Sequence, residues 1–211
     1  MIKQNKGTLI VTSIILLLPM VIGLYLWNKL PEQIPVHWNV YGEVDGWGSR
    51  STLVFAFPLF TIGLQWLCVL TTSFDKKSGG MKGKPIQLVL WVCPYVSMVV
   101  HTLVYTKILG YDLDAKVIMP LSMGLMFMVI GNLLPKCKRN RNIGIKLPWT
   151  LADDENWNKT HRLAGKLWVL GGAVMMASSL LGSHIIFFSI TLFMGLIPTV
   201  YSYLLDRKKI G

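Results

Sequence analysis

Six long apolar runs, separated by short polar segments, dominate the hydrophobic pattern of this sequence. They cover residues 9–27, 53–74, 86–109, 117–134, 163–182 and 185–205. Each run is close to the ~20 residues that an α-helix needs to cross the hydrocarbon core of a bilayer. The pattern therefore predicts an all-α integral membrane protein with six transmembrane helices.

Composition agrees with this prediction. Hydrophobic residues make up 53% of the chain and charged residues 15%, whereas soluble domains contain about 45–50% and about 25%. The mean hydropathy is +0.51. The net charge of +11 would indicate a nucleic-acid partner in a soluble protein, but in a membrane protein the cations must first be placed relative to the bilayer.

The 21 Lys and Arg residues are distributed unevenly among the connections between the runs. The first, third and fifth connections, together with the ends of the runs beside them, contain only Lys29, Arg50, Lys107 and Lys116. The positive-inside rule places the cation-rich segments in the cytoplasm. This predicts that both termini are cytoplasmic, with one structured outer loop and one long basic cytoplasmic loop.

Two features predict how the chain is subdivided and packed. The segment 75–85 is basic and rich in glycine, which is typical of a flexible connector. It would separate an N-terminal helical hairpin, 1–74, from a four-helix part, 86–211. Within the four-helix part, Gly165 and the pair at 171–172 predict a small-residue surface that lets the fifth run approach a neighbouring helix closely.

The outer loop, 30–50, contains prolines, glycines, tryptophans and His37, and this composition predicts a compact fold with fixed turns, one of them at residues 45–48. Three interpretations are open. The loop could bind a peptide or a lipid headgroup through its aromatic residues. It could hold a metal through His37, Asp45 and Glu43, although zinc prefers three or four ligands. Alternatively, His37 and Asp45 hydrogen-bond within the loop while its tryptophans anchor it at the membrane surface.

The cytoplasmic loop begins with a basic segment at 135–141. Thr150 precedes three acidic residues, 153–155, which is an N-cap pattern and predicts a short surface helix that carries Trp157. His161 and Arg162 follow at the inner membrane surface. They are either a binding or relay pair or, alternatively, a hydrogen-bonded histidine beside an arginine that extends toward water.

No motif indicates an enzyme, a cofactor or a metal site. Patterns of metalloproteases, serine hydrolases and phosphate-binding loops are absent. Cys68, Cys93 and Cys137 are scattered and indicate free thiols. His101 is the one ionisable residue well inside a run, and it is either functional or a neutral histidine bonded to a neighbouring helix.

Two long motifs resemble a known family. Residues 30–49 read LPxxIPxHWNxxGxxDGWGS, and residues 131–167 read GNxxPK followed by RNxxIGIKLPWTLxDxxNWxKTHRLAGKL. Both resemble motifs of bacterial membrane proteins of the SdpI family, and the resemblance covers the whole chain, with six helices in the same order. It implies a multi-pass protein of the bacterial cell membrane.

The resemblance also implies a function. The chain would be an immunity protein against a secreted membrane-active peptide toxin, and also a signal receptor that recruits a cytoplasmic autorepressor. Membrane lipid would be a further partner, and nucleic acid would not be contacted directly. The alternative is a membrane transporter or integral membrane enzyme. The expected toxin-binding residues are His37, Trp38, Asn39, Asp45 and Trp47, and the expected repressor-binding residues are Arg139, Arg141, Trp149, Trp157 and Arg162.

Overall fold

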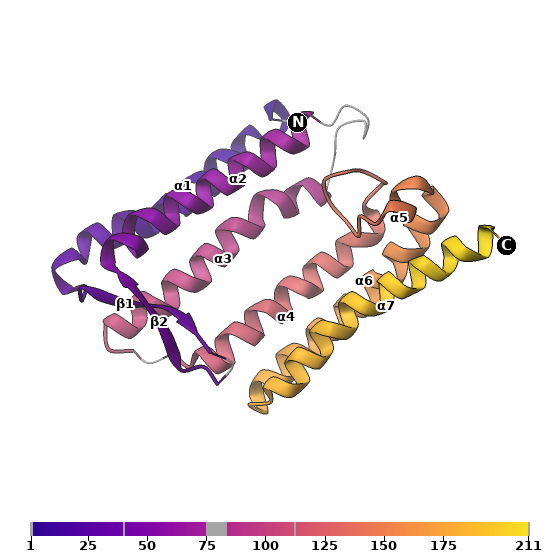
Figure 1. Cartoon of the computed structure of the whole chain (residues 1–211). Coiled ribbons are helices and arrows are strands. Elements are labelled where there is room, and N and C mark those ends of the chain that lie inside the picture. Colours follow the sequence, from indigo (N-terminus) through magenta and orange to yellow (C-terminus); the bar gives the residue numbers. More distant parts are fainter. Residues whose placement is uncertain (1, 40, 75–83, 112, 211) are drawn as a thin grey trace. The chain divides into compact units, whose positions relative to one another are not determined.

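The computed structural model describes residues 2–39, 41–74, 84–111 and 113–210 (Figure 1). In these residues, six helices are long and apolar enough to cross a membrane, which confirms the six predicted spans. They are α1 (Lys6–Tyr25), α2 (Phe57–Phe74), α3 (Lys84–Ile108), α4 (Ala115–Leu133), α6 (Asp154–Leu180) and α7 (His184–Ile210). Most of the predicted connector at 75–85 lies outside the described residues, so the division of the chain around it stays a prediction.

The chain forms two compact units. The first comprises Met1–Thr71 with Gln87–Met119, and the second comprises Thr72–Ile86 with Pro120–Gly211. The first unit contains the outer loop, and the second contains the long cytoplasmic loop. On both units the helices carry large apolar side chains that protein does not cover, such as Phe60, 64% exposed, and Leu170, 66% exposed. Such side chains are compatible with contact to lipid tails.

The outer loop is an antiparallel β-hairpin of β1 (Gln33–Trp38) and β2 (Val44–Ser49) (Figure 1). The loop is structured, as predicted, but the strands were not predicted. The base of the hairpin is fixed by a cluster of buried side chains from the helix ends and the hairpin. Its members are Leu26, Leu30, Ile34, Leu53, Val54, Val104 and Tyr105.

The turn of the hairpin lies between the end of β1 and the start of β2, and the prediction of a turn at 45–48 is wrong. The side-chain oxygen of Asn39 accepts hydrogen bonds from the backbone N–H groups of Tyr41 and Glu43, and Gly42 adopts a φ of 71°. Because Asn39 satisfies these backbone N–H groups, the turn begins at Asn39, several residues before the predicted position at 45–48. Residues 45–48 therefore continue as strand.

The glycines of β2 allow the two strands to approach each other. A Cβ atom on Gly46 would lie 2.7 Å from the Cβ of His37, and one on Gly48 would lie 2.9 Å from Cγ1 of Val36. Both distances are too short for carbon–carbon contact. The glycine-rich sequence of this strand therefore serves close packing rather than a turn.

His101 hydrogen-bonds to a neighbouring helix, as one of the two interpretations predicts. The chain before α2 forms a wide turn over Thr52–Ala56, in which the N–H of Phe57 bonds to the carbonyl of Thr52. The carbonyl of Leu53 would next meet residue 58, but Pro58 has no N–H. Nε2 of the buried His101 lies 3.3 Å from that carbonyl. Nδ1 of the same ring lies 2.8 Å from the carbonyl of Ser97, and a neutral ring has one N–H to donate. With the proton on Nε2, His101 satisfies backbone that a proline has left without a donor.

The predicted small-residue surface of the fifth span is confirmed. A Cβ on Gly124 of α4 would lie 2.5 Å from the carbonyl oxygen of Gly172 of α6, and one on Gly131 would lie 2.8 Å from that of Gly165. The two contacts are seven residues apart on each helix, which is about two turns. Gly171 faces Met194 of α7. Glycine thus lets α6 pack against both neighbours.

The glycine contacts predict a sharp dependence on side-chain volume. Gly131→Ala and Gly172→Ala should each lower the free energy of unfolding by about 1–3 kcal/mol, because the new methyl group meets backbone that cannot move aside. Unfolding of the purified protein in detergent measures the effect. Gly195→Ala on α7 is the matched control, because nothing lies within 4 Å of its Cβ position. Equal stability of Gly131→Ala and Gly195→Ala would contradict the packing described.

Candidate functional site

The face of the hairpin that points away from the helix ends carries polar and aromatic side chains. Asp45, Trp47 and Ser49 alternate along β2 and are exposed, and Trp47 retains 59% of its surface. His37 of β1 joins this face, because its Nδ1 lies 2.6 Å from Oδ1 of Asp45. His37, Asp45 and Trp47 are therefore presented together.

The His37–Asp45 contact fixes the orientation of an exposed imidazole. The carboxylate accepts the Nδ1–H, so the ring is oriented by Asp45 and Nε2 is left for an external partner. The side chain of His37 is 70% exposed. The predicted hydrogen bond within the loop is thus confirmed, and the residue stays accessible.

The remaining residues predicted at the outer site serve the fold. Trp38 is half-buried against the cluster at the base of the hairpin. Asn39 makes the turn and also donates to Oε2 of Glu43 at 3.0 Å. Glu43 is therefore bonded to Asn39, and the described part of the chain contains no group of three or more potential metal ligands.

The cytoplasmic loop is built around Trp157, which is fully buried. Its indole Nε1–H donates to the carbonyl of Cys137 at 2.8 Å, and its ring stacks on His161 with centroids 4.0 Å apart. Cys137 is a buried free thiol, and burial raises the pKa of that thiol. Cys68 and Cys93 are also thiols rather than disulfides, as predicted.

Both ring nitrogens of His161 are used inside the protein. Nδ1–H donates to the carbonyl of Trp157 at 2.8 Å, and Nε2 accepts from the N–H of Ile145 at 3.0 Å. This pattern defines the neutral ring with its proton on Nδ1. Gly144 has a φ of 122° and lies against the stacked rings of Trp157 and His161. A Cβ at this position would lie 2.8 Å from the indole of Trp157. His161 is hydrogen-bonded, as one interpretation predicts, and is not free to relay a proton.

The prediction that Thr150 caps a short surface helix is wrong. Thr150 lies inside α5 (Pro148–Ala152), where its hydroxyl donates to the carbonyl of Ile145 and accepts from the N–H of Leu147. Asp153 is the N-cap, accepting from the N–H groups of Glu155 and Asn156. The helix that it caps is α6 itself, which continues without a break into the span.

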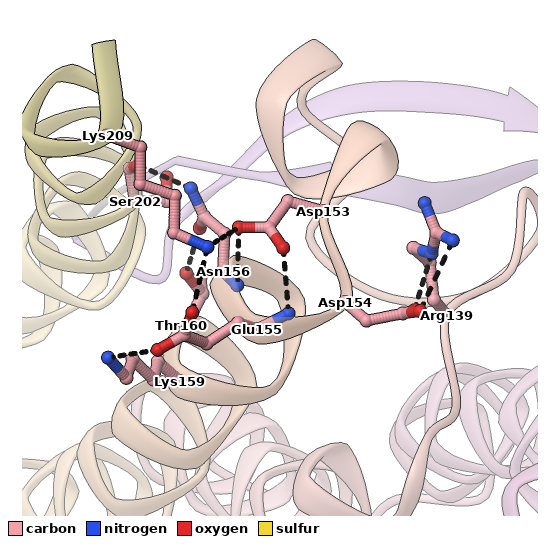
Figure 2. Close-up of polar contacts among 9 residues, drawn as sticks. All are labelled: Arg139, Asp153, Asp154, Glu155, Asn156, Lys159, Thr160, Ser202 and Lys209. Atoms are coloured by element: carbon pink, nitrogen blue, oxygen red, sulfur yellow. Dashed lines mark hydrogen bonds and ion pairs between the residues drawn. The ribbon is translucent and has the colours of Figure 1, made fainter.

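Polar contacts join the start of α6 to the end of α7 (Figure 2). The ammonium of Lys209 lies 2.7 Å from Asp153 and 2.8 Å from Glu155, and the amide of Asn156 donates to the carbonyl of Ser202 at 2.9 Å. The hydrogen bond from Lys209 lowers the pKa of the Asp153 carboxyl. Because the ionised form is the paired one, this stabilisation is present above the ordinary carboxyl pKa and is lost as the pH falls through the lowered value.

The predicted repressor-binding residues divide into two groups. Trp157 is buried, and the indole of Trp149 donates to the hydroxyl of Ser202 at 2.9 Å, so both tryptophans hold the loop together. Arg139 is paired with Asp154 at 2.6 Å (Figure 2). Arg141 and Arg162 are exposed and form the accessible part of the predicted set.

Several structural residues of this loop have no signal in the sequence. Asn140 is buried, donates to the carbonyls of Lys138 and Ile143, and accepts from two backbone N–H groups. Lys209 bonds to residues more than 50 positions away. An asparagine followed by turn residues is a weak indicator of such a role, and nothing in the sequence marks Lys209.

These features define the class of protein: a multi-pass helical membrane protein with a folded hairpin on one set of helix ends and a hydrogen-bonded polar loop in its second unit. Comparison with known proteins makes this more specific. Residues 136–202 match the model of the SdpI/YfhL protein family, and residues 14–62 match a domain of unknown function, DUF1648. The cytoplasmic loop and most of the two spans that follow it are therefore similar to the SdpI/YfhL family.

A curated relative aligns along nearly the whole chain. It is the immunity protein SdpI of Bacillus subtilis strain 168, which is 25% identical over 209 residues, covering 96% of this chain and 97% of the relative. No solved structure matches. The two family models cover the outer hairpin and the cytoplasmic loop separately, so both of the regions described above lie in matched sequence.

The burial of Trp157 and the exposure of Trp47 predict opposite effects of the same substitution. Trp157→Ala should cost about 3–5 kcal/mol of stability, because it leaves a cavity and an unpaired carbonyl. Trp47→Ala should change stability by less than about 0.5 kcal/mol. Thermal unfolding in detergent measures both. A large loss of stability in the Trp47 variant, or none in the Trp157 variant, would contradict the assignment of Trp157 to the fold and Trp47 to the surface.

Proposed function

We propose that this chain is a membrane immunity protein, which protects a bacterium from a secreted membrane-active peptide toxin by binding it at the outer face. The full-length similarity to an immunity protein is the observation that carries the proposal. The cation distribution, which places the hairpin outside the cell, supports it, because a secreted toxin arrives from that side.

The exposed face of the hairpin supplies suitable chemistry for this binding. A large, rigid aromatic side chain such as Trp47 contributes binding energy when a partner buries it, and tryptophan is enriched among the residues that dominate interfaces. The His37–Asp45 pair beside it adds an oriented hydrogen-bonding group and a carboxylate. Binding by this face requires no catalysis and no cofactor.

We further propose a signalling function, in which the cytoplasmic loop recruits an autorepressor. The observation in its favour is that Arg141 and Arg162 are exposed beside a loop whose other polar groups are largely paired. A rigid scaffold with free cations suits a complementary acidic surface. The repressor itself would bind DNA, and this chain would not.

A transporter or integral membrane enzyme is the rival class, and its main support in the sequence was His101. The two ring nitrogens of that residue lie 2.8 Å and 3.3 Å from the backbone carbonyls of Ser97 and Leu53, and the one N–H of a neutral ring donates to one of them. A structural role therefore accounts for the buried position of His101, and we assign no catalytic residue. A transport activity measured in liposomes would favour the rival.

Protection should depend on the exposed hairpin face. In a sensitive bacterium that expresses this protein and is challenged with a panel of secreted membrane-active peptides, the wild type should raise survival against its cognate toxin. His37→Ala and Trp47→Ala should each reduce toxin binding by about 2 kcal/mol, roughly thirtyfold, at unchanged abundance in the membrane. Tyr111→Ala, another exposed aromatic substitution, is the control. Full protection by both hairpin variants would refute the assignment of the site.

Recruitment of the repressor should depend on the cytoplasmic cations. Arg141→Glu and Arg162→Glu should abolish co-sedimentation of the autorepressor with membranes, since each reverses a charge at the proposed contact, and should leave survival under toxin unchanged. Lys29→Glu makes the same charge change on the outer side and should leave recruitment intact. Loss of protection whenever recruitment is lost would show that the two faces do not act separately.

A further inference from the structure

The hairpin leaves one side of β2 without a partner strand. Among the described residues the sheet has two strands, so each pairs along one edge only. The backbone groups on the other edge are ready-made positions for a further strand. Which groups point outward is fixed by the register of the two strands.

The register places the N–H and C=O of Trp47 on the free edge. The N–H of Arg50 donates to the carbonyl of Glu32 at 3.1 Å, and Pro35 is paired with Trp47 three positions further along the ladder. Hydrogen-bonded and non-hydrogen-bonded pairs alternate in an antiparallel sheet, so the pair of Pro35 and Trp47 is non-hydrogen-bonded. Its backbone groups therefore point away from the partner strand.

The same parity directs the N–H of Ser49, which is paired with Gln33, outward. The C=O of Ser49 belongs to the helical turn that begins at residue 50, where the side chain of Ser49 accepts from the N–H of Thr52. The other edge of the hairpin is different. Pro35 occupies the corresponding outward position on β1, and proline has no N–H to offer. At this pair of residues, Trp47 of β2 provides both a donor and an acceptor, whereas Pro35 of β1 provides an acceptor alone.

Side chains next to this edge give it a defined chemical character. Trp47 is 59% exposed. Residues 32–49 contain Glu32, Glu43 and Asp45 and no Lys or Arg, although the whole chain has a net charge of +11. Lys116 lies against Gly42 at the turn, whereas the charged residue of β2 is Asp45, two positions from Trp47. This stretch of the edge is therefore aromatic and acidic, and its complement is an extended segment with apolar and cationic side chains.

We propose that the free edge of β2 binds an extended segment of the peptide toxin as an added β-strand. This deepens the proposed immunity function and rests on it. Main-chain hydrogen bonds to the N–H and C=O of Trp47 and to the N–H of Ser49 supply affinity that is independent of the toxin's sequence, and alternate side chains of the added strand supply selectivity. An apolar side chain packs on the indole, and a cationic one faces the carboxylate of Asp45.

A matched pair of variants isolates the backbone contribution. Trp47→Ala removes the indole and keeps the N–H, whereas Trp47→Pro removes both. Because this N–H does not bond to β1, proline here leaves the hydrogen bonds of the hairpin in place. Trp47→Pro should bind about tenfold more weakly than Trp47→Ala, and equal thermal unfolding midpoints would show that the hairpin survives.

Binding is measured with three labelled synthetic peptides of about eight residues, which is the length of a typical strand. One repeats Lys-Thr-Val-Thr, which places Lys and Val side by side on one face of the strand, one repeats Glu-Thr-Val-Thr, and one is the Lys–Val peptide with two prolines. The protein is held in nanodiscs of phosphatidylcholine, with empty nanodiscs as the blank, and fluorescence anisotropy gives the affinity. The Lys–Val peptide should bind, the Glu–Val peptide should bind about tenfold more weakly, and the proline peptide should not bind.

Peptides N-methylated at every second residue test the edge with the wild-type protein. Methylation in one register should abolish binding and in the other should leave it unchanged, because the amides of an added strand alternate between facing β2 and facing away. Equal binding of both registers, or equal binding of the Trp47→Ala and Trp47→Pro variants, would overturn strand addition.

Survival under toxin separates the two proposals. If the wild type protects and Trp47→Pro protects as well as Trp47→Ala, the edge proposal fails and the immunity function stands. If the wild type never protects, the immunity function fails, and the peptide measurements still decide whether the edge accepts a strand.

Discussion

The requirement that backbone polar groups inside a bilayer be satisfied within the protein governs this structure. Helices meet it along most of the chain, and side chains of neighbouring helices add further hydrogen bonds to backbone carbonyls. His101 lies within hydrogen-bonding distance of the carbonyl of Leu53, and the hydroxyl of Tyr105 donates to the carbonyl of Pro19 at 2.7 Å. Among the described residues, Ser13 Oγ and Gln65 Oε1 are the buried side-chain atoms left without a partner. The same requirement confines irregular backbone to the connections between spans, which is where the two candidate sites lie.

The two sites use their polar groups in opposite ways. In the cytoplasmic loop, His161, Trp157 and Thr150 all hydrogen-bond to backbone within the loop. Such a network rigidifies the loop and keeps these side chains from a partner, so only the cations around it are accessible. On the hairpin, by contrast, the imidazole and the indole remain largely exposed. The asymmetry favours the hairpin as the face that binds a ligand directly.

The sequence predicts the spans well because the bilayer sets their length. It predicts the close approach of α6 to its neighbours because glycines at 165 and 172 are typical of a helix surface that packs against another helix. It does not predict the hairpin. Ile34 and Pro35 are both buried, which breaks the alternation expected of a strand, and the Asp-Gly signal at 45–46 competes with the turn that Asn39 makes. The partners of His161 and Lys209 also could not be read from the sequence, because they depend on packing between segments that periodicity does not relate.

The account depends most on the side of the membrane that the hairpin faces. The direct measurement is labelling of Tyr41→Cys, an exposed position in the hairpin turn, with a membrane-impermeant maleimide in a variant whose three native cysteines are serine. Arg141→Cys in the cytoplasmic loop is the opposite marker. The account predicts that intact cells label residue 41 and that residue 141 is labelled only after the membrane is opened. Labelling of residue 41 only after opening would place the hairpin inside the cell and contradict it.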